Sequence, residues 1–198
     1  MMTTLVKRAV DCDVEQIVDS IILAFSADPF ARWMYPSAQK YLKCFPDFVR
    51  IFSSKAFKQK NVYFTDDYSG AAVWFPPHSN PDIDAIGEYL AQTISQQQQE
   101  KVFAVFEQMG HYHPNESHWY LGILGVDPSQ HRQGYGSALI RPVLKKCDRT
   151  NQIAYLESSS PDSASLYQRQ GFELLETIQI DDSPPVFPMV RYPKSTLN

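Results

Sequence analysis

Residues 119–139, WYLGILGVDPSQHRQGYGSAL, carry the strongest structural signal in the chain. The apolar run over residues 119–126 is rich in β-forming side chains and stops at Asp127-Pro128, which is typical of a buried strand that ends in a turn. A polar loop follows, and Gly134-Tyr135-Gly136 then opens a segment with helical spacing. The stretch therefore predicts a strand, a glycine-rich turn and a helix.

The start of such a helix is a binding site for anions. Its first N–H groups have no partner within the helix, and the helix dipole places partial positive charge there. Gly134 and Gly136 allow the backbone to approach an anionic oxygen closely, so a phosphate is the predicted ligand. A P-loop would need a lysine directly after the last glycine, where this chain has Ser137. Arg132 stands near the position of a further glycine in dinucleotide-binding loops, which weakens that interpretation too.

The stretch resembles motif A of the GNAT superfamily of acyl-CoA-dependent N-acyltransferases. That motif reads Gln/Arg-x-x-Gly-x-Gly/Ala after a strand that ends in Val-x-Pro. Residues 126–136 match it except at the Gln/Arg position, where this chain has His131. A second family motif, Tyr-x-x-x-Gly-Phe, is matched by Tyr167, Gly171 and Phe172 at the expected distance. The resemblance extends over residues 6–192, and residues 156–191 look most like the puromycin N-acetyltransferase branch.

The composition sets limits on the class of protein. The chain has 198 residues, which is enough for one domain with a sizeable core. Its formal net charge is -4, so the chain has no surplus of basic residues that would indicate a nucleic acid or membrane partner. The acidic balance slightly favours cationic amines as substrates. Three widely spaced cysteines, Cys12, Cys44 and Cys147, match no metal spacing. Neither a signal peptide nor a membrane span is predicted, so we expect a cytoplasmic protein. We expect it to be a monomer or a homodimer.

The remaining segments alternate between the hydrophobic period of a strand and that of a helix. A capping box at Asp13 and Gln16 is predicted to begin the first helix. The aromatic residues of segment 30–57 are interpreted as core packing. Alternatively, some of them line an acceptor pocket, and we then expect Phe30, Trp33 and Tyr35 to do so, because two prolines bracket them in a predicted loop. The expected strands are 5–10, 61–65, 71–75, 118–126, 153–157, 172–180 and 186–192, and the expected helices are 14–26, parts of 30–57 and 81–108, 134–147 and a short one after residue 158.

This order predicts an α/β (α+β) fold with a mixed, mostly antiparallel sheet of about seven strands. The resemblance implies a single GNAT-like domain over residues 1–198, in which the central parallel strand pair splays apart and helices flank the sheet. It also implies variable helices on the acceptor side, at about 29–58 and 81–110, and a coenzyme-binding core at about 118–172.

The family's co-substrate is acetyl-CoA, and the resemblance implies which residues hold it. The splay would lie between residues 124–126 and 156–158, with Gly125 as a plausible site of distortion. Backbone groups of Leu124, Gly125 and Val126 would hold the thioester. The remaining coenzyme-binding candidates are Arg132, Gln133, Gly134, Tyr135, Gly136 and Ser137 at the diphosphate, together with Ser163.

The resemblance assigns Tyr167 as the general acid, because its counterpart in the family protonates the coenzyme sulfur. A phenol of pKa about 10 remains protonated at neutral pH, as a proton donor must. The general base is left open. Some family members carry a glutamate at the position of Tyr120, whereas this chain offers His118 or Glu157, and many such enzymes need no dedicated base.

The leading hypothesis is an N-acetyltransferase that acts on the primary amine of a small molecule through a ternary complex. The alternatives are a protein or peptide N-terminal acetyltransferase and a catalytically silent acyl-CoA-binding regulator. No metal site is predicted, because no further ligand completes the pair His111 and His113. The acceptor amine and the preferred acyl chain are not specified by the sequence.

Overall fold

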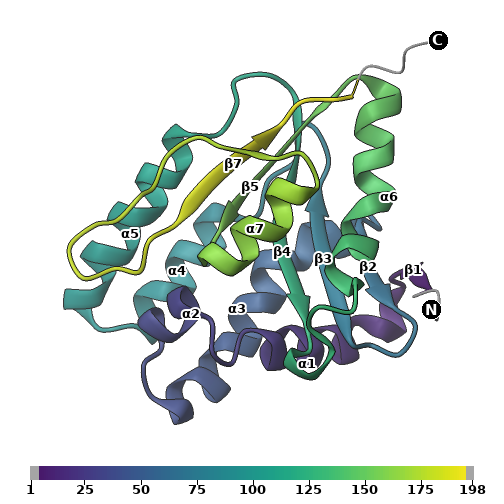
Figure 1. The fold of residues 1–198 in the computed structure, drawn as a ribbon. Coiled ribbons are helices and arrows are strands. Elements are labelled where there is room, and N and C mark those ends of the chain that lie inside the picture. The colour runs from purple at the N-terminus through teal and green to yellow at the C-terminus, as the bar shows by residue number, and fades with distance from the viewer. Residues whose placement is uncertain (1–4, 195–198) are drawn as a thin grey trace.

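The computed structural model describes residues 5–194, which form a mixed seven-stranded sheet flanked by helices (Figure 1). The strand order is β1-β2-β3-β4-β5-β7-β6, in which β4 and β5 are parallel and all other neighbours are antiparallel. The predicted mixed sheet is therefore confirmed. The strands are β1 (Val6–Arg8), β2 (Val62–Thr65), β3 (Gly70–Phe75), β4 (His118–Val126), β5 (Ile153–Ser158), β6 (Glu173–Leu174) and β7 (Phe187–Arg191).

Helices cover both faces of the sheet. On one face, one hydrophobic cluster joins the sheet to α1 (Val14–Ala24), α2 (Pro29–Met34), α3 (Ala38–Lys58), α4 (Ile83–Thr93) and α5 (Gln96–His111). On the other face, which is nearer the viewer in Figure 1, a second cluster holds α6 (Tyr135–Thr150) and α7 (Pro161–Arg169). Short 3-10 turns occur at Asp11–Asp13 and Pro128–Gln130.

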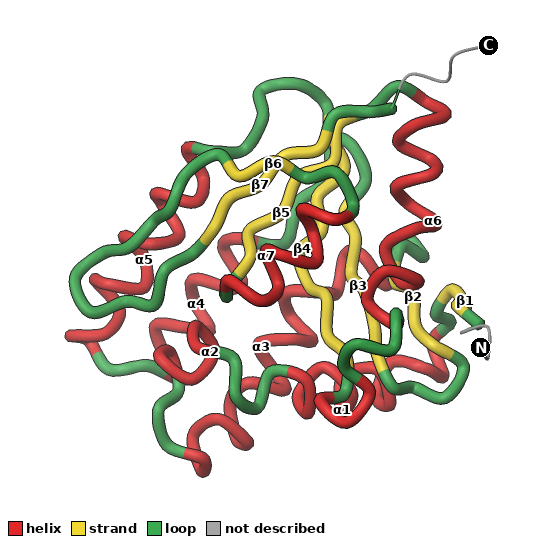
Figure 2. The backbone as a smooth tube through the Cα atoms, in the orientation of Figure 1, coloured by secondary structure: helices red, strands yellow, loops and turns green. Residues whose placement is uncertain are grey.

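The parallel strands β4 and β5 form a fork. Their pairing runs from His118 and Ile153 to Leu121 and Leu156 and then stops, although both strands continue. Figure 2 shows them diverging toward their C-terminal ends, with α7 in front. The predicted splay is therefore present, and it opens before the expected residues 124–126.

The distortion of β4 lies at Gly122 and not at Gly125, so that part of the prediction was wrong. Val73 pairs with Ile123 and Trp74 with Leu121, which leaves Gly122 without a partner on β3 as a β-bulge. A Cβ atom at Gly122 would lie 2.6 Å from the ring of Phe52, so only glycine fits there. The bulge therefore packs tightly against α3, which is far from it in the sequence.

Three further expectations differ from the structure. Phe30 and Trp33 lie on α2 and not in a loop, because Asp28 accepts a hydrogen bond from the N–H of Ala31 (2.9 Å) and so caps a helix that begins with Pro29. The carboxylate of Asp13 bonds to the N–H of Val10 and the hydroxyl of Tyr68, so it forms no cap for α1. The strand expected over 172–180 is reduced to β6 and an isolated bridge between Ile178 and Val186.

Other segments follow the sequence closely. The hairpin of β2 and β3 and the strand β4 lie where the sequence places them. The region 81–108 contains two helices, and Ser95 caps the second of them at the glutamine run. Among residues 5–194, no helix combines the length and the apolar character needed to cross a membrane.

Candidate functional site

The loop between β4 and α6 presents free backbone N–H groups. Arg132 and Gly134 adopt left-handed conformations, with φ of 62° and 91°, and turn the chain sharply into α6. Within residues 5–194, no side chain caps α6 and no acceptor pairs with the N–H groups of Tyr135, Gly136 and Ser137. Donors of this kind at a helix start suit an anion such as a diphosphate.

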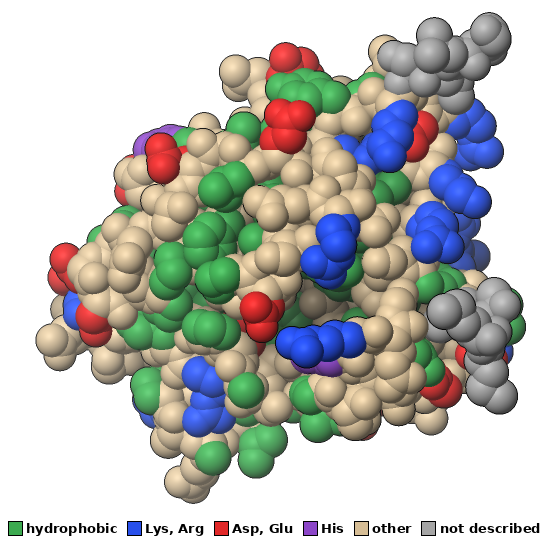
Figure 3. All heavy atoms as spheres, viewed as in Figure 1, with side chains coloured by type: hydrophobic (Ala, Val, Ile, Leu, Met, Phe, Trp, Pro, Cys, Tyr) green, Lys and Arg blue, Asp and Glu red, His purple; other side chains and the backbone are tan. Residues whose placement is uncertain are grey.

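Side chains hold this loop in place. The Tyr135 hydroxyl donates to Asp67 (3.2 Å), the Gln133 amide donates to the carbonyl of Ser129 (3.4 Å), and Ser137 accepts from Gln170 at the end of α7 (3.2 Å). A Cβ atom at Gly136 would lie 3.0 Å from the side chain of Leu166, so glycine allows α7 to pack close to the start of α6. Figure 3 shows the surface hollowed beside this start, with Lys and Arg side chains at its borders.

A cavity of about 830 Å³ occupies the fork. Its walls include residues from both hydrophobic clusters, so it reaches both faces of the sheet. The predicted site residues that line it are His118, Leu124, Gly125, Val126, Glu157, Ser163 and Tyr167. Arg132, Gln133, Gly134, Tyr135, Gly136 and Ser137 are not part of its wall and lie together at the α6 loop.

Tyr167 lies on α7, buried but lining the cavity. Its ring packs edge-on against Phe172, with ring centroids 5.9 Å apart. Burial raises the pKa of the Tyr167 phenol above its usual value, and the nearby negative charge of Asp28 adds to the increase. The hydroxyl therefore stays protonated throughout the neutral range.

Glu157 lies where β5 separates from β4, with only 4% of its side chain exposed. Its Oε1 is 3.0 Å from Nε2 of His113, a residue on the connector after α5 that sequence reasoning had set aside. The ring of His113 also contacts Tyr120 and Tyr155, with centroids 4.9 Å and 4.4 Å away. Burial, followed by the Glu157 charge, raises the pKa of both tyrosines, so they remain neutral beside the carboxylate.

His118 is at the edge of the same cluster. Its Nδ1 lies 2.8 Å from the carbonyl of Glu116, and its ring is 5.6 Å from that of His113. Burial lowers the pKa of His118, which favours the neutral imidazole. His118 and Glu157, the two candidate bases, are thus brought to one side of the cavity.

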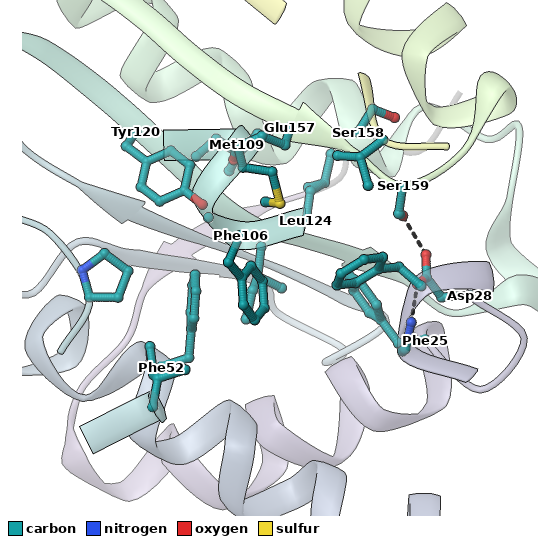
Figure 4. Close-up of a pocket in the computed structure, with 18 of the residues that line it drawn as sticks. Phe25, Asp28, Phe52, Phe106, Met109, Tyr120, Leu124, Glu157, Ser158 and Ser159 are labelled. Carbon is teal, nitrogen blue, oxygen red and sulfur yellow. Dashed lines mark hydrogen bonds between the residues drawn. The ribbon is translucent and has the colours of Figure 1, made fainter. Parts of the chain in front are cut away.

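Asp28 and Ser159 form a second polar pair in the cavity wall, which sequence reasoning missed. The Ser159 hydroxyl donates to Oδ2 of Asp28, and the other oxygen of Asp28 accepts from Ala31 (Figure 4). Burial raises the pKa of the Asp28 carboxyl, partly offset by the hydrogen bond from Ser159. The sequence signal at Asp28-Pro29 indicated only the end of a helix.

The cavity wall opposite α7 is apolar, and we call this part the apolar chamber. Figure 4 shows Phe52 from α3 and Phe106 from α5 facing into it. The chamber is lined by Phe30, Phe48, Phe52, Ile86, Leu90 and Phe106. Of the three expected aromatic walls only Phe30 lines the cavity: Tyr35 is fully buried and bonds to Thr93, and Trp33 packs against Phe30 outside it.

The residues present suit an acyl-CoA better than a metal ion. Free N–H donors at the α6 loop match an anionic diphosphate, and the open strand edges beyond Leu121 and Leu156 offer backbone groups to a pantetheine chain. In the described part of the chain, no group of three or more His, Cys, Asp or Glu side chains is arranged to hold a metal ion.

Known proteins share this sequence pattern and fold. A family model described as an acetyltransferase (GNAT) domain matches residues 64–192. An N-acetyltransferase of Schizosaccharomyces pombe is 23% identical, over 96% of this chain and 83% of its own length.

Solved structures agree. One from Corynebacterium glutamicum, described as histone acetyltransferase HPA2 and related acetyltransferase, is 26% identical with a TM-score of 0.69 over 100% of both chains. The polyamine N-acetyltransferase of Drosophila melanogaster has a TM-score of 0.68 at 17% identity, over 96% of this chain and 100% of that one, which shows a shared fold. Because the family match covers more than half of the 198 residues, the chain belongs to the GNAT family of acyl-CoA-dependent acetyltransferases.

Proposed function

We propose that the protein transfers the acetyl group of acetyl-CoA to the primary amine of a small molecule by direct attack in a ternary complex. One observation carries the proposal: Tyr167 and Glu157 line the same cavity from opposite faces of the sheet, at the fork between β4 and β5. A proton donor and a proton acceptor on either side of one reaction centre are what aminolysis of a thioester requires.

The chain supplies the contacts that hold the acetyl donor. Acetyl-CoA brings an activated thioester carbonyl, and backbone groups of Leu124, Gly125 and Val126 are proposed to polarise its oxygen. Ser163, which lines the cavity near Tyr167, is proposed to contact the pantetheine arm. The diphosphate is assigned to the α6 loop, formed by Arg132, Gln133, Gly134, Tyr135, Gly136 and Ser137.

Tyr167 is proposed as the acid that protonates the departing sulfur, because its raised pKa keeps the proton available. Glu157 is proposed as the base that takes the proton from the attacking amine. Its carboxylate is buried at the fork, with Oε1 3.0 Å from Nε2 of His113. His118, kept neutral by its lowered pKa, is the second candidate for this role.

The test is the variant Tyr167→Phe, assayed by release of coenzyme A with a panel of primary amines. We expect kcat to fall about 100-fold, because loss of a positioned acid removes a factor of this order. Binding of coenzyme A, measured by calorimetry, should not change. Tyr63→Phe is the matched control, because the Tyr63 hydroxyl bonds to Arg8 outside the cavity. Unchanged kcat in Tyr167→Phe would remove its role, and no turnover of any amine by the native protein would contradict the function.

Two finer assignments remain part of the proposal. Residues 156–191 support a place near the puromycin N-acetyltransferase branch, which does not make puromycin the substrate. The helical segments 29–58 and 81–110 are proposed to form the acceptor side of one domain, since α3, α4 and α5 supply most of the apolar chamber. A peptide substrate is the alternative, and higher activity on peptides than on free amines would favour it.

A further inference from the structure

The cavity wall has an uneven distribution of charge. Its acidic residues are Asp28, Glu107 and Glu157, and in the described part of the chain neither Lys nor Arg lines it. Both oxygens of Asp28 bond to neighbouring groups, and Glu157 contacts His113. Glu107 is exposed at the rim, so water screens its charge. The carboxylates therefore lie at the fork and at the rim, and the chamber between them carries none.

The interior of the chamber is aromatic and aliphatic. Phe48, Ile86 and Leu90 are buried in its wall, and the rings of Phe48 and Phe52 lie 5.9 Å apart. A second ammonium group placed here would lose its water and find no partner, which is costly. An apolar group would instead gain from leaving water. The cavity as a whole thus favours a ligand with one cationic end, which lies at the fork, and one apolar body, which fills the chamber.

Beside Glu107, the rim near α4 and α5 carries two exposed apolar side chains. Ile83 is 66% exposed and Phe103 is 37% exposed, and both line the cavity. Large exposed apolar side chains at the mouth of a cavity are a typical mark of a ligand entrance. The rim lies on the acceptor side, on the opposite face of the sheet from the α6 loop.

We propose that the acceptor is a primary amine attached to a bulky apolar group, with its nitrogen at Glu157 and its apolar body in the chamber. This inference rests on the proposed function. The structure disfavours polyamines, whose charges recur along the chain. A long acyl chain on the donor is a rival occupant of the same space, and varying the donor as well as the acceptor separates the two.

The first experiment compares acceptors and donors with the native protein. With acetyl-CoA, we expect kcat/KM for 2-phenylethylamine and hexylamine to exceed that for 1,4-diaminobutane and ethanolamine by at least about 10-fold, because apolar pockets discriminate on this scale. With 2-phenylethylamine, lengthening the acyl chain from acetyl to hexanoyl should lower the rate. Equal or better use of the diamine overturns the inference, as does a rate that rises with acyl length but ignores the acceptor.

The second experiment places a charge at the rim. Ile83→Glu should lower kcat/KM for 2-phenylethylamine by removing apolar surface at the rim and raise it for 1,4-diaminobutane, which changes their ratio by about 3-fold, because water screens a charge at this exposed position. Folding should be retained, since position 83 is exposed and begins α4, where acidic residues are favourable. Leu42→Glu is the matched control: Leu42 is 64% exposed on α3 and outside the cavity.

An unchanged ratio in Ile83→Glu, with coenzyme A binding intact by calorimetry, would overturn the assignment of the rim. The acceptor class and the acetyltransferase function are contradicted by different results. If polyamines or small polar amines are the better acceptors, the acceptor class is wrong and the acetyltransferase function stands. If no amine of the panel is acetylated, the proposed function itself is contradicted.

Discussion

At the scale of single residues, Glu157 differs from an ordinary surface carboxylate in several features. It is almost fully buried, it lies at the point where two strands separate, and its oxygen is 3.0 Å from His113. Two neutral tyrosines, Tyr120 and Tyr155, complete its surroundings. Burial of a charged group is costly unless its neighbours compensate, so this arrangement is more consistent with a role in proton transfer than with packing alone.

The variant Glu157→Gln tests this role while keeping the size of the side chain. We expect kcat to fall about 100-fold, because a positioned base contributes a factor of this order. Binding of coenzyme A should be retained, as measured by calorimetry. Glu107→Gln is the matched control, since Glu107 lines the same cavity at its exposed rim. Retention of more than half of kcat in Glu157→Gln would transfer the role to His118 or to no residue.

The sequence identifies site residues whose task is local. Gly134 and Gly136 act through their own backbone, and Tyr167 belongs to a short motif, so each is recognisable along the chain. The place of Asp28 in the site could not be predicted, because its partner Ser159 is 131 positions away in the sequence. The same holds for His113, because only the fold brings it to Glu157.

At the scale of elements, Arg191 ties three of them together. It lies on β7 and is 3% exposed; its Nε donates to the carbonyl of Gln170 after α7 (3.0 Å), and its guanidinium forms an ion pair with Asp148 on α6 (2.8 Å). The two helices that flank the coenzyme side are therefore fixed to the strand that pairs with β5.

Removing this anchor should destabilise the protein. Arg191→Ala leaves Asp148 without its ion-pair partner, with only the N–H of Lys194 still bonded to it, and removes the bond to Gln170, so we expect the free energy of unfolding to fall by about 3 kcal/mol. Arg50→Ala provides the control, because Arg50 forms exposed pairs with Glu15 and Asp47, whose loss should cost less than about 1 kcal/mol. Urea denaturation followed by circular dichroism measures both. Equal losses in the two variants would mean that Arg191 does not act as an anchor.

Elements whose apolar residues recur with a strong period were predictable from the sequence. Elements that depend on contacts with distant residues were not. The hairpin of β2 and β3 and the strand β4 follow directly from alternation and turn residues. The helix α2 was expected to be a loop because prolines flank it, yet Pro29 at its first turn favours a helix once Asp28 caps it. The close contact between Gly122 and the ring of Phe52 joins residues that are far apart in the sequence, and no local pattern reveals it.

At the scale of the whole molecule, the stability of the fold depends on pH through the cluster beside the fork. Burial lowers the pKa of His118, and Glu116, His113 and Glu157 surround it. The unfolded chain then binds more protons than the folded one once the pH falls to about 6.5, the ordinary value for histidine. The contribution of His118 to the free energy of unfolding should therefore decrease as the pH falls through this range.

The measurement is urea denaturation at pH 7.5, 6.5 and 5.5 for the native protein and for His118→Gln. We expect the native protein to lose more stability than the variant between the upper and lower pH, because glutamine takes up no proton. An NMR titration of the His118 ring should give a midpoint below about 6.5. The same pH dependence in both proteins, or a midpoint above that value, would contradict the account.

The fork also bears on how the reaction ends. Because the cavity reaches both faces of the sheet, spent coenzyme is proposed to withdraw past α6 and α7, and the acetylated amine to leave past α4 and α5. Neither product then blocks the exit of the other, and the geometry imposes no fixed sequence of departure.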